Sequence, residues 1–570
     1  MTDRSTERNK LLGAGSGREL AMAAGVSLVV GMLVIAPFFW LGNASGHDIA
    51  FHASSWLDVA GQWREEILYP RWSEWANHGF GEPRFIFYPP LSWMLGAALG
   101  FVVPWNMVPM VFIILVQTIA GVSLFVLARS FLSESAALFG AAIYAANPYA
   151  LLILYMRSDF AELLACAVFP LVVLAAMRLA GLVEEEEGTL AQKTAVFAIV
   201  FAVVWLSNAP AGVIASYTVA MIFAWAAIEL KSWRPLARGA RGLVLGFALA
   251  SFYLVPAAYE QRWVNIGQAL SSGLLPSQNF LYTVIADAEH NDFNRIASTT
   301  AAMLMVLVCA GGILARGVEI TGGELRERKK VWRMLAAISA AGTFLMVRAS
   351  AIFWEQLPKL RFVQFPWRWM AVLAVAFAFF GAAAVMRKGA RWAVGVAAVF
   401  ALAGTASFLV HKAWWDSEDI PVLREAIASR QGFDGTDEYD PAGDDHTDLP
   451  VNAERVQILS PKGIEGSEAR AKVEIQKWTA EQRILAVTSS EPVRVALRLL
   501  NYPAWRVEVV HEGKLSPGKL EASSKMILWA PKGASLIRAR FERTWDRSLG
   551  IALSVTGWLI VLALLSNRKL

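Results

Sequence analysis

Charged residues are scarce in this chain. Only 17% of its 570 residues are Asp, Glu, Lys or Arg, and 56% are hydrophobic. This balance excludes a soluble multidomain protein of this length, which would need a more polar surface. Cysteine is scarcer still, and its two copies, Cys166 and Cys309, both lie in apolar runs. A structural disulfide in any domain outside those runs is therefore excluded, and metal binding through thiolates is disfavoured.

Long apolar runs recur along most of the sequence. Each approaches the roughly 20 residues that a helix needs to cross a bilayer. We therefore expect a polytopic α-helical membrane protein of about twelve spans. The expected spans are 20–42, 106–128, 136–156, 163–180, 190–206, 211–228, 242–258, 299–315, 333–349, 367–386, 392–410 and 548–566. A shorter apolar segment, 89–103, begins with two prolines and ends at Pro104, so it either re-enters the membrane or crosses it at a strong tilt.

Lys and Arg gather in clusters at alternate ends of these runs. The clusters are Arg4, Arg8, Lys10 and Arg18; Lys231, Arg234, Arg238 and Arg241; Arg326, Arg328, Lys329, Lys330 and Arg333; Arg387, Lys388 and Arg391; and Arg568 and Lys569. Short basic loops stay on the cytoplasmic side, so both termini are expected on the cytoplasmic side of the membrane. Loops 43–88, 157–162, 259–298 and 350–366 and the stretch 411–547 then face outward. These clusters account for the net charge of +5, which gives no argument for nucleic acid.

The composition changes after residue 410. An acidic, turn-rich outer linker is expected at 411–451, and its stretch Asp434 to Asp440 lacks the glycine spacing of a calcium-binding EF-hand loop. From 452 to 547 short runs alternate polar and apolar residues, which predicts an extracytoplasmic antiparallel β-sandwich domain. The expected organisation is a multi-span membrane domain at 1–410, this linker, the β-sandwich, and a C-terminal transmembrane helix at 548–570. No catalytic constellation is visible in the β-sandwich, so we expect it to serve an accessory or substrate-docking role.

The first outer loop, 43–88, is rich in ionisable and aromatic residues. If a helix begins near Asp48, His52 lies one turn later, and the two could form an acid/base or metal-binding pair. A divalent metal is therefore possible, although no complete set of ligands is apparent. The alternative is an amphipathic helix at the membrane surface, with Phe51, Trp56 and Trp63 facing lipid. The other candidate binding residues in this loop are His47, Arg71, Arg84 and Tyr88.

Three further outer loops carry charge beside apolar spans. The second loop holds Arg157, Asp159 and Glu162; later loops hold Glu260, Arg361, Gln364 and Arg368. Ionisable groups at span ends are costly unless they are hydrated or paired. They could cap helices, and the later arginines could either clamp a lipid pyrophosphate or reach phospholipid headgroups. Because four loops bring such groups to one side of the membrane, we expect an active site at the outer interface.

Several short strings in these loops resemble a known family. They are Gly46-His47-Asp48, Tyr69-Pro70-Arg71-Trp72, Gly79-Phe80-Gly81, Phe87-Tyr88-Pro89-Pro90-Leu91, Gln364-Phe365-Pro366-Trp367-Arg368 and, in the β-domain, Asn501-Tyr502-Pro503-Ala504-Trp505-Arg506-Val507. They resemble bacterial membrane proteins labelled 6-pyruvoyl-tetrahydropterin synthase-related. The zinc histidines of the soluble pterin enzyme have no counterpart here. The family is in turn similar to GT-C glycosyltransferases, which transfer sugars from polyprenyl-phosphate donors.

The resemblance implies an inverting, GT-C-type membrane glycosyltransferase of the cell envelope. Asp48 would be the acid of the first outer loop and the general base, and Asp159 or Glu162 the acid of the second loop. The family's Asp-x-Asp pair is absent because Ile49 and Ala50 follow Asp48, which puts metal dependence in question. Implied partners are a polyprenyl-phosphate-linked sugar, membrane lipid, and a glycan or protein acceptor. The substrate-binding candidates are His47, His52, Arg71, Arg84, Tyr88, Arg157, Glu260, Gln364 and Arg368.

Two other functions fit the same sequence. A transporter or flippase for a lipid-linked saccharide could line its pathway with these charges. A non-catalytic envelope assembly protein could use the β-domain to hold a partner or a glycan. A cavity that converges on Asp48 from one side favours the transferase, whereas a continuous path between the leaflets favours transport.

Overall fold

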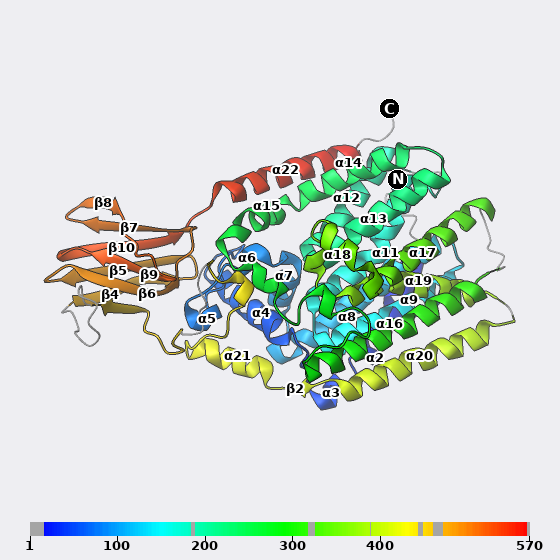
Figure 1. Ribbon diagram of the computed structural model, residues 1–570, viewed down its shortest axis with the longest axis horizontal. Helices are drawn as coiled ribbons and strands as arrows, with labels where there is room; N and C mark the ends of the chain where they lie inside the picture. Colours follow the sequence, from blue (N-terminus) through cyan, green and yellow to red (C-terminus); the bar gives the residue numbers. More distant parts are fainter. Residues whose placement is uncertain are drawn as a thin grey trace.

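The computed structural model describes residues 16–183, 188–316, 325–387, 389–442, 449–459 and 471–566. It consists of a helical bundle and a β-domain attached at one end of that bundle (Figure 1). Parts of the Lys and Arg clusters, including residues 4–10, 388 and 568–569, lie outside the described residues. So do residues 443–448 of the expected acidic linker and 460–470 of the expected β-sandwich.

Within the described residues, ten helices are long and apolar enough to cross a membrane, or up to twelve if two bent helix pairs are counted. The expected polytopic helical fold is therefore confirmed. The principal helices are α2 (Gly17–Val34), α8 (Val108–Arg129), α9 (Glu134–Ala145), α11 (Phe160–Ala180), α12 (Leu190–Ser207), α13 (Ala209–Glu229), α16 (Ala288–Leu314), α19 (Met370–Ala384), α20 (Arg391–Lys412) and α22 (Trp545–Ser566).

Two of the expected spans are bent. Arg234–Leu249 (α14) and Ser251–Trp263, which includes α15 (Ser251–Glu260), meet at 78°, and Lys329–Leu345 in α17 (Leu325–Leu345) meets Arg348–Gln356, which includes α18 (Ala351–Gln356), at 91°. The short apolar segment forms α7 (Pro90–Leu99). Ten residues at about 1.5 Å each make a helix of about 15 Å, half the thickness of a bilayer core, so α7 does not cross by itself.

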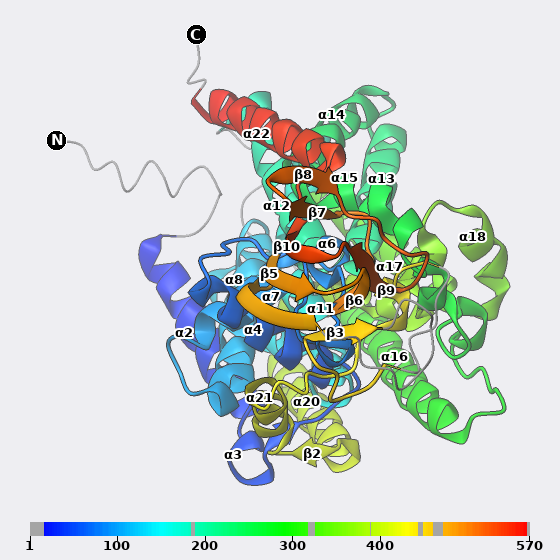
Figure 2. The same cartoon turned by 90° about the vertical axis from the view of Figure 1, so that its left-hand side faces the viewer.

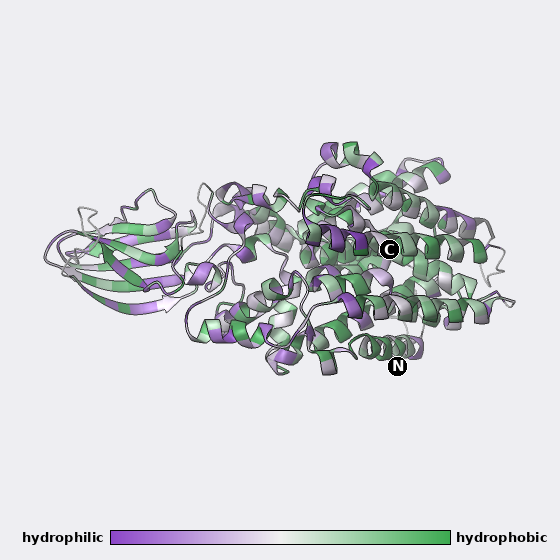
Figure 3. Ribbon diagram, turned by 60° about the horizontal axis from the view of Figure 1, so that its bottom comes forward, coloured by the Kyte–Doolittle hydropathy of each residue, from purple (hydrophilic) through white to green (hydrophobic). Residues whose placement is uncertain are grey.

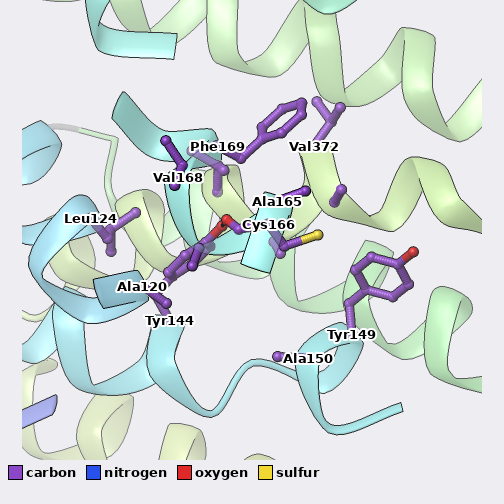
Figure 4. Packing of buried hydrophobic residues seen from close by; sticks show 14 of the residues in the cluster. Ala120, Leu124, Tyr144, Tyr149, Ala150, Ala165, Cys166, Val168, Phe169 and Val372 are labelled. Carbon is purple, nitrogen blue, oxygen red and sulfur yellow. Dashed lines mark hydrogen bonds between the residues drawn. The ribbon is translucent and has the colours of Figure 1, made fainter. Parts of the chain in front are cut away.

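Helices α11 and α19 lie at the centre of the bundle. The apolar window of the span at Pro366–Ala384 is 100% buried and that at Phe160–Ala180 is 89% buried, against 17% for α20 and 22% for α22. A helix that is hydrophobic on every face needs such a surrounding. Figure 4 shows part of this packing, where the Tyr144 hydroxyl donates to the Cys166 carbonyl at 2.7 Å. The peripheral helices expose apolar side chains, and the ribbons of the bundle are predominantly hydrophobic (Figure 3).

The loops carrying the candidate residues meet at one end of the bundle. Strand β1 (Asn43–Ala44) pairs with β2 (Trp415–Asp416), which brings the ends of α2 and α20 together. Between β1 and α7 the chain forms α4 (Ile49–Arg64), α5 (Ala76–Gly79) and α6 (Arg84–Phe87). The remaining short elements are α3 (Phe38–Leu41), η1 (Trp105–Met107), α10 (Pro148–Leu152), η2 (Ile153–Arg157), η3 (Gln261–Trp263), η4 (Ile266–Leu270), η5 (Pro276–Gln278), η6 (Arg348–Ser350), η7 (Leu360–Val363), η8 (Pro366–Trp369), α21 (Asp419–Ala428) and η9 (Asp437–Tyr439).

The β-domain consists of two antiparallel sheets that share one apolar core. A five-stranded sheet has the order β4-β5-β10-β7-β8 and a three-stranded sheet the order β3-β6-β9. The strands are β3 (Val456–Leu459), β4 (Ala471–Thr479), β5 (Gln482–Ser489), β6 (Val493–Leu500), β7 (Trp505–His511), β8 (Lys514–Pro517), β9 (Lys525–Ala530) and β10 (Gly533–Phe541). Alternate residues of both sheets form the core, among them Leu485, Val495, Leu528 and Ile537. The expected β-sandwich is confirmed, although the sequence pattern did not reveal β3, β8 or β9.

The β-domain is docked on the first long loop through buried arginines. Arg483 on β5 lies 3.4 Å from the Glu74 carboxylate, and the Arg498 guanidinium on β6 donates to the His78 carbonyl oxygen. The Trp72 ring packs between Tyr502 and Trp505 of the domain. After β10 the chain enters α22, which runs back along the bundle (Figures 1 and 2). The domain is therefore held by both its strands and its connection to the last helix.

The Glu74 contact makes the stability of this docking depend on pH. Burial raises the pKa of Glu74 to about 7, although Arg483 opposes the shift. The folded state binds a proton on Glu74 more tightly than the unfolded state does. Protonation of Glu74 therefore stabilises the fold; this stabilisation is complete below the unfolded pKa of 4.5 and is lost as pH rises through 7. We expect wild-type protein to gain about 1–2 kcal/mol from this group between pH 8 and 5.5. Thermal unfolding of the Glu74→Gln variant should show a correspondingly weaker pH dependence, and an unchanged dependence would contradict this assignment.

Candidate functional site

Two loops far apart in sequence interlock around Asp48. The Asp48 backbone N–H donates to the Arg157 carbonyl at 2.8 Å, and the Gly46 N–H donates to the Ser158 hydroxyl at 3.0 Å. That hydroxyl in turn donates to the Ala44 carbonyl at 2.7 Å. A Cβ atom on Gly46 would lie 2.5 Å from the Arg157 carbonyl carbon, so only glycine permits this approach. The local backbone therefore fixes Asp48 beside Arg157.

Asp48 presents one free carboxylate oxygen. Its Oδ2 atom accepts from the Arg157 guanidinium, with the Nε atom at 3.0 Å and the Nη2 atom also in contact. Its Oδ1 atom accepts no hydrogen bond from any residue that the structure describes. The Asp48 side chain is 30% exposed, whereas that of Arg157 is 6% exposed. The buried Arg157 Nη1 atom also lacks a hydrogen-bond partner within the described part of the chain.

Behind this pair lies a buried network centred on Arg368. The Arg368 Nε atom is 3.0 Å from Glu162 Oε2, and its Nη2 atom is 3.4 Å from Asp159 Oδ2. Asp159 Oδ2 also lies 3.8 Å from Arg157, and Asp159 Oδ1 lies 3.5 Å from His52 Nε2. The side chains of His52, Asp159, Glu162 and Arg368 are at most 4% exposed. Three carboxylates, counting Asp48, thus share two guanidinium groups, which makes the burial of these charges tolerable.

Local chain geometry places the acids of the second loop. Arg157 ends the π-helical turn η2, and Ser158 adopts a left-handed conformation with φ of 53°. Asp159 then caps α11 by accepting from the Glu162 N–H at 2.9 Å. Burial raises the pKa of Asp159, but the His52 ring 3.5 Å away and the charges of Arg157 and Arg368 outweigh it, and the net pKa lies below its usual value. Asp159 is therefore ionised at neutral pH.

Three more of the expected binding residues lie around this cluster. The exposed His47 ring packs edge-on against Phe293 with centroids 4.8 Å apart. Tyr88 lies against Phe51 and His52, with centroid distances of 4.6 and 5.8 Å. Gln364 Oε1 lies 3.4 Å from Arg368 Nη1. The structure thus brings together His47, Asp48, His52, Tyr88, Arg157, Asp159, Glu162, Gln364 and Arg368.

Arg84 belongs to a separate buried network. Its Nε atom lies 2.6 Å from Glu82, and its Nη1 atom donates to Ser54 at 2.9 Å and Ser55 at 3.1 Å. The Thr436 N–H donates to Glu82 at 2.8 Å, so this network fastens the linker after β2 to the first long loop.

Glu260 and Arg71 also lie away from the Asp48 cluster. Both Glu260 oxygens accept from Arg547, at 2.7 and 2.8 Å, and Tyr502 donates to one of them at 2.6 Å. Glu260 thereby joins α15 to the β-domain and α22. The Arg71 guanidinium lies over the Tyr69 ring at 4.4 Å. Glu260 therefore helps to hold the β-domain in place, whereas this Arg71 contact lies within the first long loop.

Two site residues were missed by the sequence analysis. Tyr149 donates to the Glu162 carboxylate, and Ser158 ties the two loops together. Tyr149 lies inside an apolar run without any charge pattern, so no local signal marks it. Ser158 lies between Arg157 and Asp159, and that position is the one signal that could have found it.

A small apolar pocket adjoins the cluster. Its cavity volume is about 10 Å³, room for about one water molecule, and its wall includes Ser158 and Asp159 but not Asp48. The other lining residues are Phe38, Ala44, Ile113, Ile153, Leu154, Phe160 and Leu163.

The cluster does not resemble a metal centre. The described residues contain no group of three or more His, Cys, Asp or Glu side chains that could hold a metal ion. The nearby carboxylates instead direct their oxygens at arginine, tyrosine or backbone donors. Within this cluster Asp48 Oδ1 is therefore the one carboxylate oxygen with no donor among the described residues.

The fold and the cluster define a multi-pass membrane protein with a buried charged site at the end of the bundle that carries its β-domain. Residues 85–416 match the family model described as the 6-pyruvoyl-tetrahydropterin synthase related domain, a membrane protein family. The chain belongs to this family. A search of curated proteins gave no match.

Solved membrane glycosyltransferases are similar to this chain in structure. The arabinofuranosyltransferase AftD from Mycobacteria is 20% identical with a TM-score of 0.42, over 72% of this chain and 27% of that chain. The oligosaccharyltransferase AglB from Archaeoglobus fulgidus, solved with an inhibitory peptide and a dolichol-phosphate, is 13% identical with a TM-score of 0.40, over 74% and 56% respectively. The similarity covers well under two thirds of either relative's length.

Proposed function

We propose that this protein is an integral membrane glycosyltransferase that moves a sugar from a polyprenyl-phosphate donor to a glycan or protein acceptor. The observation that carries the proposal is Asp48: one oxygen is fixed by Arg157 and the other is free at the edge of a buried charged cluster. A general base needs a carboxylate that is oriented and accessible at once. Family membership and the similarity of the chain to membrane glycosyltransferases agree with this proposal.

In the proposed reaction, the hydroxyl oxygen of the acceptor bonds to the anomeric carbon of the sugar, and Asp48 Oδ1 accepts the proton of that hydroxyl. The bond from that carbon to the phosphate oxygen breaks, and the anomeric configuration inverts. The leaving phosphate needs positive charge. Arg157 is the better placed arginine for this role, because its Nη1 atom is unpartnered among the described residues while Arg368 is directed at two carboxylates.

Asp159, Glu162, Arg368 and His52 act as positioning residues in this proposal. Their side chains are buried and paired with one another, so they hold Arg157 and the Asp159 turn in place. Gln364 and Tyr88 line the same region and are proposed to contact substrate. A catalytic site works best when surrounding residues hold its charged groups in position before the substrate binds.

We propose that the site and the β-domain face outward from the bacterial cytoplasmic membrane. The clusters of Lys and Arg support this orientation, because they precede α2 and lie between α13 and α14 and between α19 and α20. The β1–β2 pairing, the Asp48–Arg157 contact and the Gln364–Ala269 hydrogen bond of 2.7 Å join the loops at the opposite end.

The test is direct transfer by purified protein in detergent or nanodiscs. The protein is incubated with a panel of polyprenyl-phosphate sugars and candidate acceptors, and both free polyprenyl phosphate and glycosylated acceptor are measured. The expected product has the opposite anomeric configuration to the donor. A retained configuration, or transfer from nucleotide sugars instead of lipid donors, would contradict the proposal.

The transport alternative receives less support. Transporters often contain broken helices, and the two helix pairs bent by 78° and 91° fit that feature. The bundle interior beneath the Asp48 cluster, however, is predominantly apolar. A transport pathway would need polar groups along its length. In proteoliposomes, movement of a lipid-linked saccharide between leaflets without any transfer product would favour transport and overturn the transferase.

A further inference from the structure

The outward face of the five-stranded sheet carries an excess of positive charge. Its inner face packs against the three-stranded sheet, with Val507, Val509, Ile537 and Ala539 all buried. The alternating residues point the other way. The charged members of this outward set are Lys472, Glu474 and Lys477 on β4, Arg506 and Glu508 on β7, and Arg538 and Arg540 on β10. Cations thus outnumber carboxylates on this face.

Most of these cations have no counter-charge among the residues that the structure describes. Glu508 lies opposite Arg538 in the sheet register, but it contacts Arg506 at 3.6 Å instead. Arg538 and Arg540 form no ion pair with any residue in the described part of the chain. Arg540 lies directly opposite Arg506, and like charges in that position destabilise a sheet. Glu508 and Glu542, each 3.6 Å from Arg506, offset part of this repulsion, and an anion bound beside Arg540 would offset more of it.

Next to the cations runs a row of half-buried and exposed apolar residues. The register aligns Ala486 on β5 with Leu536 on β10, Leu536 with Val510 on β7, and Val510 with Leu515 on β8. Leu515 is 60% exposed. The face is therefore an extended surface on which a row of apolar side chains lies beside a row of cations. Such a surface suits a polymeric ligand rather than a small ion.

We infer that this face binds an anionic polysaccharide, with Arg538 and Arg540 as its principal contacts. The domain extends beyond the end of the bundle and away from its apolar helices, which argues against a bilayer surface as the partner (Figures 1 and 3). The outward strand positions include no aromatic side chain on which nucleic-acid bases could stack. The further step, that this polysaccharide is the acceptor, rests on the proposed transfer reaction. Binding of the polysaccharide to this face does not depend on that reaction.

The test measures binding of fluorescent polygalacturonate, a carboxylated polysaccharide, to the purified full-length protein. Guanidinium groups form charge-assisted hydrogen bonds with carboxylates, so the Arg538→Gln, Arg540→Gln double variant is expected to bind about tenfold or more weakly. Binding of wild-type protein should weaken as salt rises, since Arg540 is exposed and Arg538 only half-buried. Neutral dextran of the same length should not bind. The double variant should unfold at or slightly above the wild-type temperature, because it breaks no ion pair within the described residues and removes the Arg540–Arg506 repulsion.

A matched control removes the same charge from elsewhere in the domain. Arg494 on β6 pairs with Glu521 at 2.6 Å, and the exposed Lys519 lies in the segment between β8 and β9. The Arg494→Gln, Lys519→Gln variant should bind polygalacturonate as wild type does. Equal binding by wild type and the Arg538, Arg540 variant would overturn the inference. So would tighter binding of poly-glutamate of equal charge. If the Arg538, Arg540 variant loses polygalacturonate binding but still transfers sugar to short acceptors, the proposed function stands. If wild-type protein binds polygalacturonate but transfers no sugar, only the inference about the binding face stands.

Discussion

Asp48→Asn is expected to lower the transfer rate of purified protein by about 10²- to 10⁴-fold, the usual contribution of a general base. The substitution keeps the shape of the side chain and removes its ability to take a proton. The side chain is partly exposed, so folding should change little. The loss should appear in kcat rather than in KM for the donor, because the base acts in the transition state.

The control for this experiment is Asp292→Asn. Asp292 lies on α16 beside Phe293, which contacts His47, so it is near the site. It forms only an exposed pair with Arg295, 2.8 Å away and about two thirds exposed on both sides. Such pairs contribute little. Full activity is expected for Asp292→Asn, and full activity in Asp48→Asn would contradict the role given to Asp48.

Arg368→Met is expected to produce the largest loss of stability. It removes the only guanidinium that contacts Glu162 among the described residues, and it leaves the more distant Arg157, 3.8 Å away, as the remaining guanidinium beside Asp159. Breaking a buried ion pair on one side costs about 3–5 kcal/mol, since a charge is left buried without compensation. We expect a clearly lower unfolding temperature and loss of transfer, measured on protein purified in the same detergent.

A second substitution separates lost charge balance from lost packing. The Arg368→Met, Glu162→Gln double variant neutralises the carboxylate that Arg368 otherwise pairs with at 3.0 Å. Replacing both charges is far less costly than removing one. The double variant should recover much of the stability that Arg368→Met loses, and no recovery would show that packing of the long Arg368 side chain dominates.

The secondary structure was largely predictable because its signals are local. Apolar runs of the right length marked the spans, and alternation marked five of the strands of the β-domain. The pattern did not reveal the bends near Ala250 and near Met346, since apolar residues continue on both sides of each bend. It also missed the short strands β3 and β8, because four residues carry too little alternation to detect.

The candidate site was predictable as a set of residues but not as a geometry. Charged residues at the ends of apolar spans marked Asp48, Arg157, Asp159, Glu162 and Arg368 as unusual. The same rule also selected Arg84 and Glu260, which the structure gives to separate networks with Glu82 and Arg547. Nothing in the local sequence distinguishes a buried arginine that joins two loops from one that could meet a substrate.

The sequence by itself determined that this protein crosses a membrane many times, that a β-domain precedes its last helix, and that charged loops gather at one end. Those properties follow from hydrophobicity, alternation and charge, which act over a few residues. Only the tertiary structure decided which carboxylate pairs with which arginine, because those partners lie far apart in the chain. The contact of Asp48 with Arg157 depends on a close backbone approach at Gly46 and a left-handed Ser158. That approach leaves one Asp48 oxygen free, since a single guanidinium occupies the other.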